Sequence, residues 1–207
     1  MVGCKKRDPW VPTNVSRLSG NPPDPGWVSH YVGVRGDTGA EVSVCGPAEL
    51  RELVRAGGEG RSIRSAADFG AWVSALALDE LAEPFTFVVD GGGVLRLAPR
   101  RSEHVVCAGG GEVLSAGEMS FCEESGRWVV EEVSNQSTGY CPDVSSWPAV
   151  AEALDGIGIH RPSGFTHEVV FRRCHSCREL SIVREMDSVC VFCGEDLPRE
   201  RNVGEPG

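Results

Sequence analysis

Residues 85–98 read Phe-Thr-Phe-Val-Val-Asp-Gly-Gly-Gly-Val-Leu-Arg-Leu-Ala, and they indicate how the central third of the chain folds. Two apolar runs, 85–89 and 94–98, flank an Asp-Gly-Gly-Gly turn. Glycine adopts the positive φ angles of a tight turn at little steric cost, so the stretch predicts a hairpin of two antiparallel strands. Similar pairs of apolar runs predict four further strands of an antiparallel meander, at 104–108, 112–115, 119–122 and 127–133.

Helices are expected before and after this meander. Pro47 begins a predicted helix over 47–56, because proline is favoured in the first helical turn. A second helix starts at Ser65, whose hydroxyl can cap it, and its apolar residues recur at spacings of three and four. A third helix is predicted near 146–154. Three more short strands are expected at 28–34, 41–45 and 165–171.

Two Cys-x-x-Cys pairs stand near the C-terminus, Cys174 with Cys177 and Cys190 with Cys193, with 12 residues between the pairs. Zinc prefers four soft ligands in a tetrahedron, and two such pairs supply four thiolates around one ion. A hairpin between 180–184 and 188–191 would bring the second pair back to the first.

Residues 171–197 resemble the zinc-ribbon family and, more loosely, the rubredoxin knuckles. The resemblance implies one structural zinc ion bound by Cys174, Cys177, Cys190 and Cys193. Iron would fit four thiolates equally well, so the spacing leaves zinc and iron both open. Four protein ligands leave no open position for a water molecule, which argues against catalysis by this metal.

The fold class that these patterns predict is α+β. We expect an antiparallel sheet flanked by a few helices, with a small C-terminal zinc ribbon. Hydrophobic residues make up 41% of the 207 residues and charged residues 24%, which is typical of a globular protein. The expected organisation is an irregular proline-rich arm (1–27), an α+β body (28–164), and the zinc ribbon with its tail (165–207).

A polar loop over 134–142 is the best candidate for a ligand site outside the ribbon. It joins a predicted strand to a predicted helix, and the N-terminus of that helix would favour an anionic or nucleotide-like ligand. The same residue types also make local turns, so both interpretations stay open. Cys141 could act as a nucleophile if an imidazole lay nearby, with His104 or His167 as candidates. The candidate ligand-binding residues are Asn135, Gln136, Ser137, Thr138, Tyr140, Cys141 and His104.

The charge of the chain bears on its partners. Asp and Glu total 30 against 20 Lys and Arg, a formal net charge of −10, which disfavours nucleic acid as a partner. The chain has no run of 18 apolar residues and no export signal at its N-terminus, so we expect no membrane association, a cytoplasmic location and reduced cysteines. The predominance of arginine over lysine suits a bacterial genome rich in G and C.

These patterns identify a metal site but no reaction. The phosphate-loop, dinucleotide-binding, zinc-protease and serine-hydrolase motifs are absent from the sequence. Our first hypothesis is therefore a binding, adaptor or accessory module with a structural zinc and a protein partner. The alternative is an enzyme or ligand-binding domain that uses the loop 134–142, and whether the chain is an enzyme stays uncertain from the sequence.

Overall fold

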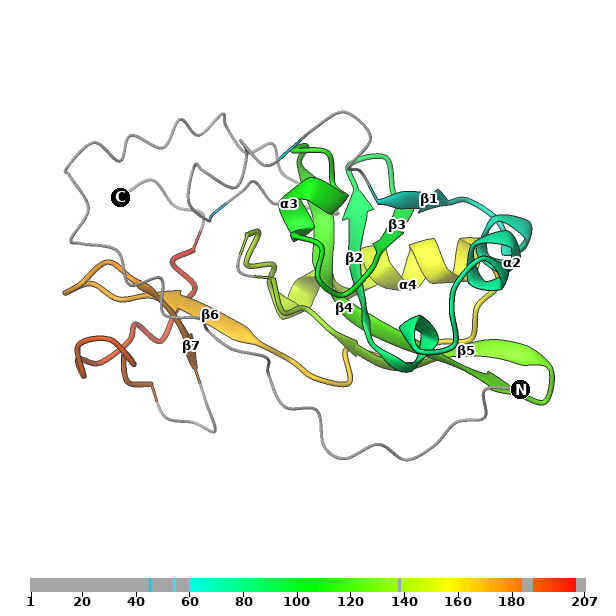
Figure 1. Ribbon diagram of the computed structural model, residues 1–207. Coiled ribbons are helices and arrows are strands. Elements are labelled where there is room, and N and C mark those ends of the chain that lie inside the picture. The colour runs from blue at the N-terminus through cyan, green and yellow to red at the C-terminus, as the bar shows by residue number, and fades with distance from the viewer. Residues whose placement is uncertain (1–44, 46–53, 55–59, 138, 184–187, 204–207) are drawn as a thin grey trace.

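The computed structural model describes residues 45, 54, 60–137, 139–183 and 188–203. The predicted arm and the predicted strand 28–34 lie outside the described residues. The predicted strand 41–45 and helix 47–56 lie almost wholly outside them. Within the described residues the chain is α+β, as the sequence predicts, with one five-stranded antiparallel sheet and one two-stranded sheet (Figure 1).

The main sheet has the strand order β1-β3-β2-β4-β5, and every neighbouring pair is antiparallel. The predicted hairpin at 85–98 forms its centre. The Asp90 side chain accepts hydrogen bonds from the backbone of Gly92 and Val94, and Gly93 takes a φ of 76°. The strands are β1 (Arg61–Ile63), β2 (Phe85–Asp90), β3 (Leu95–Ala98), β4 (Val113–Glu124) and β5 (Arg127–Ser134).

One face of this sheet carries the larger hydrophobic core. Helices α2 (Ala66–Ser74) and α4 (Trp147–Gly156) contribute apolar side chains to this core, as do Phe85, Phe87 and Val89 of β2. These three side chains share a face because successive residues of a strand point to opposite sides. The helix predicted from Ser65 is confirmed, since the Ser65 hydroxyl accepts a hydrogen bond from the backbone of Asp68. Two short 3-10 turns, η1 (Glu80–Ala82) and η2 (Val144–Ser146), complete the body.

The opposite face is covered by a smaller cluster around α3 (His104–Cys107), which packs with Val88 and Tyr140. The sequence prediction of a strand over 104–108 is therefore wrong. Gly109 and Gly110 both take positive φ angles, and their backbone N–H groups bond back to Val106 and Val105, which closes a helical turn instead of a hairpin.

Strand β4 is continuous where the sequence predicts two separate strands. The predicted strands 112–115 and 119–122 are parts of this one strand, which pairs with β2 and β5. Gly117 is required by a close backbone approach, because a Cβ atom there would overlap the carbonyl oxygen of Ser134 on β5. The glycine therefore marks a crowded position inside a strand and does not mark a turn.

We predict that Gly117→Ala destabilises the protein by about 3 kcal/mol, because the added methyl group would push β4 away from β5. Urea unfolding measures the change. Gly70→Ala in α2 is the matched control, since a Cβ there meets no atom within 4 Å. Alanine favours a helix over glycine by up to about 1 kcal/mol, so the control should gain stability. Equal effects of the two substitutions would contradict the crowding at Gly117.

The C-terminal segment forms the second sheet from β6 (Val170–Arg173) and β7 (Leu180–Val183). The strand expected at 165–171 thus begins five residues later, at Val170. The hairpin expected between 180–184 and 188–191 is also wrong in its pairing, because β7 pairs with β6 through the first cysteine turn. Val189 instead forms an isolated antiparallel bridge with Asp196 across the second cysteine turn.

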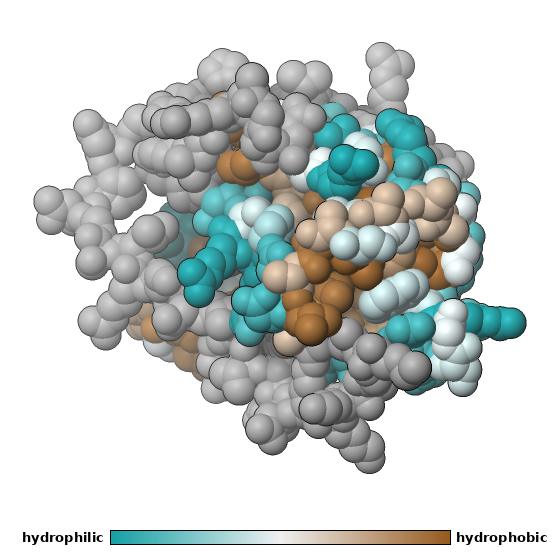
Figure 2. Space-filling model, turned by 45° about the vertical axis from the view of Figure 1, so that its right-hand side comes forward, coloured by the Kyte–Doolittle hydropathy of each residue, from teal (hydrophilic) through white to brown (hydrophobic). Residues whose placement is uncertain are grey.

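Figure 2 shows apolar atoms gathered in a patch with hydrophilic side chains around it, on the side of the body that lies to the right in Figure 1. Leu78, between α2 and η1, is 75% exposed. In the ribbon, Val191 and Phe192 are 61% and 52% exposed.

Candidate metal centre

The two cysteine pairs adopt the same local structure. Backbone N–H groups of Arg178 and Gly194 bond back to the carbonyl oxygens of Cys174 and Cys190, at 3.0 and 2.9 Å. Each turn has a second hydrogen bond of the same kind. The N–H of Cys174 donates to the carbonyl oxygen of Glu179, and the N–H of Cys190 donates to that of Glu195. Arg178 and Gly194 both have positive φ angles, 64° and 78°, as the tight turn requires. The positive φ of Gly194 belongs to the second of these knuckles.

The two knuckles bring four sulfur atoms together. All four lie within 4.8 Å of one another, and the Sγ–Sγ distances are 3.6 Å for Cys174 with Cys193 and for Cys177 with Cys190. A tetrahedron with Zn–S bonds of about 2.3 Å has S–S edges of about 3.8 Å. Among the described residues this is the one such group of His, Cys, Asp or Glu side chains, and its geometry fits a tetrahedral metal ion.

Hydrogen-bond donors surround the sulfur of Cys190. Desolvation raises the pKa of this thiol, but the Ser181 hydroxyl, 3.4 Å from the sulfur, and the backbone N–H groups of Phe192 and Cys193 outweigh it and lower the pKa to about 6. Donors of this kind stabilise a thiolate, the form that binds a metal. Desolvation and the neighbouring thiols act in the opposite sense on Cys177 and raise its pKa to about 12. The donors therefore favour a thiolate at Cys190, and four thiolates around one divalent ion would carry a net charge of −2.

The outer surface of the second knuckle is apolar. Val191 and Phe192 project from it between the two ligands, while Cys174 and Cys190 are buried beneath the ribbon surface. Cys193 is exposed, so the four-cysteine cluster lies near the surface.

The predicted ligand loop is largely engaged within the protein. The Asn135 side chain is fully buried; its amide donates to the carbonyl oxygens of Pro142 and Val169 and accepts from the backbone N–H of Val169. Ser137 is buried and accepts from the backbone of Tyr140. The Tyr140 hydroxyl donates to the carbonyl oxygen of Gly111 at 2.6 Å. These hydrogen bonds connect the end of β5 to Val169, just before β6, and connect the loop to Gly111 of the body.

The remaining candidates of the loop are Gln136 and Thr138. Gln136 is half-buried, and its Oε1 atom is buried without a hydrogen-bond partner among the described residues. Thr138 lies outside the described residues. A ligand-binding role for the loop stays a prediction, and the contacts of Asn135, Ser137 and Tyr140 give these three side chains a structural role.

We predict that Asn135→Ala lowers the free energy of unfolding by about 3 kcal/mol, because it leaves three buried backbone groups without partners. Chemical denaturation measures the loss. Gln136→Ala is the neighbouring control, since its Oε1 atom makes no hydrogen bond with a described residue, and we expect little change. A loss as large for Gln136→Ala as for Asn135→Ala would contradict the structural role of Asn135.

His104 lies apart from the loop, in α3. The residue is half-buried, and Nε2 donates to the carbonyl oxygen of Gly117 at 2.9 Å. Desolvation lowers the pKa of His104 to about 4, although that hydrogen bond opposes the shift. A neutral imidazole bonded to the backbone of β4 supports the sheet.

This pKa shift predicts a dependence of stability on pH. An exposed histidine takes up its proton near pH 6.5, whereas the folded protein holds His104 neutral to about pH 4. Between these values the unfolded chain binds more protons, so stability is full above pH 6.5 and is lost as the pH falls toward 4. We expect this loss to approach about 3 kcal/mol, at about 1.4 kcal/mol for each pKa unit.

Urea unfolding between pH 4 and 7.5 measures this effect. His104→Gln cannot titrate, so the loss of stability that comes from His104 should be missing when the pH of this variant is lowered. If the native protein and His104→Gln show parallel pH profiles, the prediction for His104 is wrong.

The cysteines outside the knuckles are not all reduced. Cys141 forms a disulfide with Cys45, 96 residues away in the sequence, and Cys122 is disulfide-bonded as well. The expectation of reduced cysteines is therefore wrong for these three residues, and in this state Cys141 has no thiol to act as a nucleophile. Nothing in the spacing identifies this pairing, because sequence alone does not give disulfide connectivity. Cys107 is a free, buried thiol, and burial raises its pKa to about 12.

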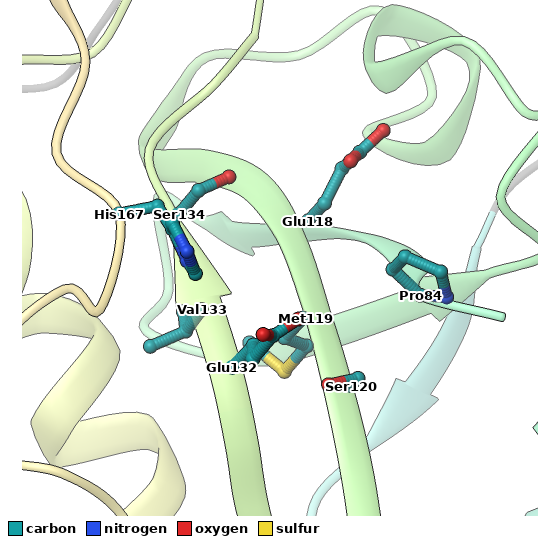
Figure 3. Close-up of a pocket in the computed structure, with 8 residues that line it drawn as sticks. All are labelled: Pro84, Glu118, Met119, Ser120, Glu132, Val133, Ser134 and His167. Carbon is teal, nitrogen blue, oxygen red and sulfur yellow. The ribbon is translucent and has the colours of Figure 1, made fainter. Parts of the chain in front are cut away.

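Figure 3 shows the residues that line a small hollow beside β4 and β5. Ser134 and His167 line it, so His167 lies beside the start of the loop, although residues 135–142 do not line the hollow. The Ser120 hydroxyl in its wall is buried without a hydrogen-bond partner among the described residues. The other residues of the wall are Pro84, Glu118, Met119, Glu132 and Val133.

Among the described residues, no helix is both long enough and apolar enough to cross a lipid bilayer. Comparison of the chain with models of protein families, with curated proteins and with solved structures finds no match. What can be concluded about function therefore rests on the geometry of the chain itself, and its firmest feature is a four-cysteine centre with the shape of a tetrahedral metal site.

Proposed function

We propose that this chain is a binding module whose C-terminal ribbon holds one structural zinc ion and contacts a partner protein. The observation that carries the proposal is the four-sulfur cluster, which has no open position for a substrate. Zinc is preferred to iron in the proposal because it requires no redox partner, and Cys174, Cys177, Cys190 and Cys193 would be its ligands. When bound, the ion would supply the folding energy of a segment too small to build a core of its own.

The partner surface in this proposal is the second knuckle. Val191 and Phe192 are exposed there on a backbone that the metal would hold rigid. A rigid apolar side chain loses little entropy on binding, which favours its use as a contact residue. The body carries the acidic charge of the chain, with 22 acidic and 13 basic residues among residues 1–159, so nucleic acid stays disfavoured as the partner.

A photo-crosslinking experiment in the native cells tests the adaptor role. A photoreactive phenylalanine analogue replaces Phe192 in one protein and Leu78, a more exposed apolar residue of the body, in the control. We expect a discrete cross-linked product from position 192, its absence from position 78, and its loss when Cys174 and Cys190 are both alanine. The same products from both positions, or none from position 192, would contradict the proposal.

The alternative of a ligand site in the loop 134–142 receives less support. Asn135, Ser137 and Tyr140 already make hydrogen bonds within the protein. A binding site that used these groups would have to break the contacts that join the loop to the body. The adaptor role therefore remains our first proposal.

We also propose a cytoplasmic location, as expected from the sequence. One observation, a disulfide, argues against it. Disulfides such as Cys45–Cys141 persist in oxidising compartments and are rare in the cytoplasm. Acid quenching of native cells, followed by alkylation and mass spectrometry, decides the question. Free thiols at Cys45 and Cys141 would support the cytoplasm, whereas a complete disulfide would support an oxidising compartment.

A further inference from the structure

The segment after the second knuckle connects the metal centre to the body. Leu197 is buried against Cys174 and Cys190, so it packs directly beneath two of the four sulfur ligands. The chain then runs along β6, where the Arg172 side chain donates to the carbonyl oxygens of Pro198 and Arg199. We call residues 197–203 the tail.

The far end of the tail reaches the loop that holds the disulfide. The Asn202 side chain bonds both backbone groups of Arg173, and Val203 is buried in a cluster that includes Cys141. The Arg201 guanidinium donates to the carbonyl oxygen of Cys141 at 2.9 Å and lies 3.5 Å from the carboxylate of Asp143. The tail thus makes contact with the metal ligands at one end and with Cys141 at the other.

The disulfide fixes the surface to which the tail binds. Cys45 is bonded to Cys141, and its backbone N–H donates to the carbonyl oxygen of Gly139 at 2.8 Å. Cys141 itself has a φ of 49°, an unusual value for a residue with a side chain, and the cross-link and the surrounding cluster hold it there. That cluster also contains Phe171 of β6, and Leu180 and Ile182 of β7 pack against it.

We propose that the Cys45–Cys141 disulfide and the metal centre are energetically coupled through the tail, so that the disulfide-bonded protein binds zinc more tightly than the protein with two thiols. This inference rests on the proposed zinc site. The disulfide orders the loop, the ordered loop retains Arg201 and Val203, and the tail then holds Leu197 against the two buried ligands. Coupling is reciprocal, so bound zinc must favour the disulfide by the same factor.

The chemical step is thiol–disulfide exchange with a monothiol of the glutathione class. One thiolate attacks a sulfur of the Cys45–Cys141 bond, forms a mixed disulfide and releases one protein thiolate. A second thiolate attacks the mixed disulfide and releases the other. Two thiols are oxidised to one disulfide, and Cys45 and Cys141 each gain one electron and one proton.

The first test measures zinc affinity in the full chain by competition with a chromophoric chelator. Cys45→Ala/Cys141→Ala should bind zinc about 10-fold more weakly than the disulfide-bonded protein, within the range usual for coupled sites. Cys107→Ala, which removes a buried thiol of the body, is the matched control and should leave the affinity unchanged. Equal zinc affinities with and without the disulfide would overturn the coupling.

A second test leaves the disulfide in place, in case the double variant fails to fold. Native protein and Arg201→Gln are equilibrated in glutathione redox buffers with and without saturating zinc, and mass spectrometry gives the fraction of the Cys45–Cys141 disulfide. Zinc should shift the disulfide-to-dithiol ratio of the native protein about 10-fold, and Arg201→Gln should abolish most of the shift. No zinc-dependent shift in the native protein would overturn the inference.

The two tests separate this inference from the function on which it rests. If the native protein binds no zinc, the proposed metal site fails and the coupling fails with it. If zinc binds in one equivalent but its affinity and the disulfide are independent, only the coupling is overturned.

Discussion

Removing two metal ligands, in Cys174→Ala/Cys190→Ala, should abolish zinc binding and unfold the ribbon while the five-stranded sheet stays folded. Structural zinc contributes about 10–16 kcal/mol of binding free energy to small metal domains at neutral pH, and here that energy would organise residues 170–203. The cluster around the metal adds only Leu197 and the partly buried Val183 to the cysteines, and a second small cluster around Phe171 packs β6 and β7 against Cys141. The full chain should contain one zinc ion by elemental analysis, and the variant none.

Hydrogen exchange tests where the variant loses structure. We expect fast exchange of the backbone amides of β6 and β7 in Cys174→Ala/Cys190→Ala, and unchanged protection in β2 and β4, whose core lies in the body. Cys107→Ala is the control for the loss of a buried thiol and should keep both zinc and protection. A variant that retains one equivalent of zinc, or a ribbon that stays protected without metal, would contradict the structural role of the four cysteines.

Removing the disulfide, in Cys45→Ala/Cys141→Ala, should give the second largest effect. The bond closes a loop of 96 residues, and the entropy of such a closure corresponds to about 4–5 kcal/mol of stability. For a chain of this length, that loss lowers the Tm by about 10 °C or more. Calorimetry of the zinc-saturated proteins measures the difference, so that the metal state is the same in both.

Chemical reduction provides an independent check of this loss. A reductant also breaks the disulfide of Cys122, so the native protein and the double variant should melt at about the same temperature when both are reduced. Cys107→Ala should melt close to the native protein, because Cys107 is free. Equal melting temperatures for the oxidised native protein and the double variant would contradict a stabilising disulfide.

The parts of the fold that the sequence predicts correctly are those set by nearby residues. The hairpin at 85–98 depends on its own turn, in which Asp90 bonds the backbone of Gly92 and Val94. The helix at Ser65 depends on a cap three residues away. The two cysteine knuckles likewise close within five residues of Cys174 and Cys190.

The errors arise where a distant contact decides the local structure. Two strands are expected at 112–115 and 119–122, but they form the single strand β4, in which Gly117 allows the close approach of the Ser134 backbone. The apolar pair Val105–Val106 suggests a strand, yet the two glycines after it close a helical turn that covers the sheet. Distant contacts also hold the polar loop, since Asn135 bonds Val169, 34 residues away, and the ligand-binding role expected for the loop stays a prediction.

The sequence by itself determined the α+β class and the four cysteines that gather into one cluster, because strand alternation, turn chemistry and Cys-x-x-Cys spacing act over a few residues. Tertiary structure alone decided that β7 pairs with β6, that Cys141 is bonded to Cys45, and that the tail joins the metal centre to the loop. The reason is physical: contacts between distant residues depend on how the whole chain closes its loops and packs its core, and no short pattern encodes that choice.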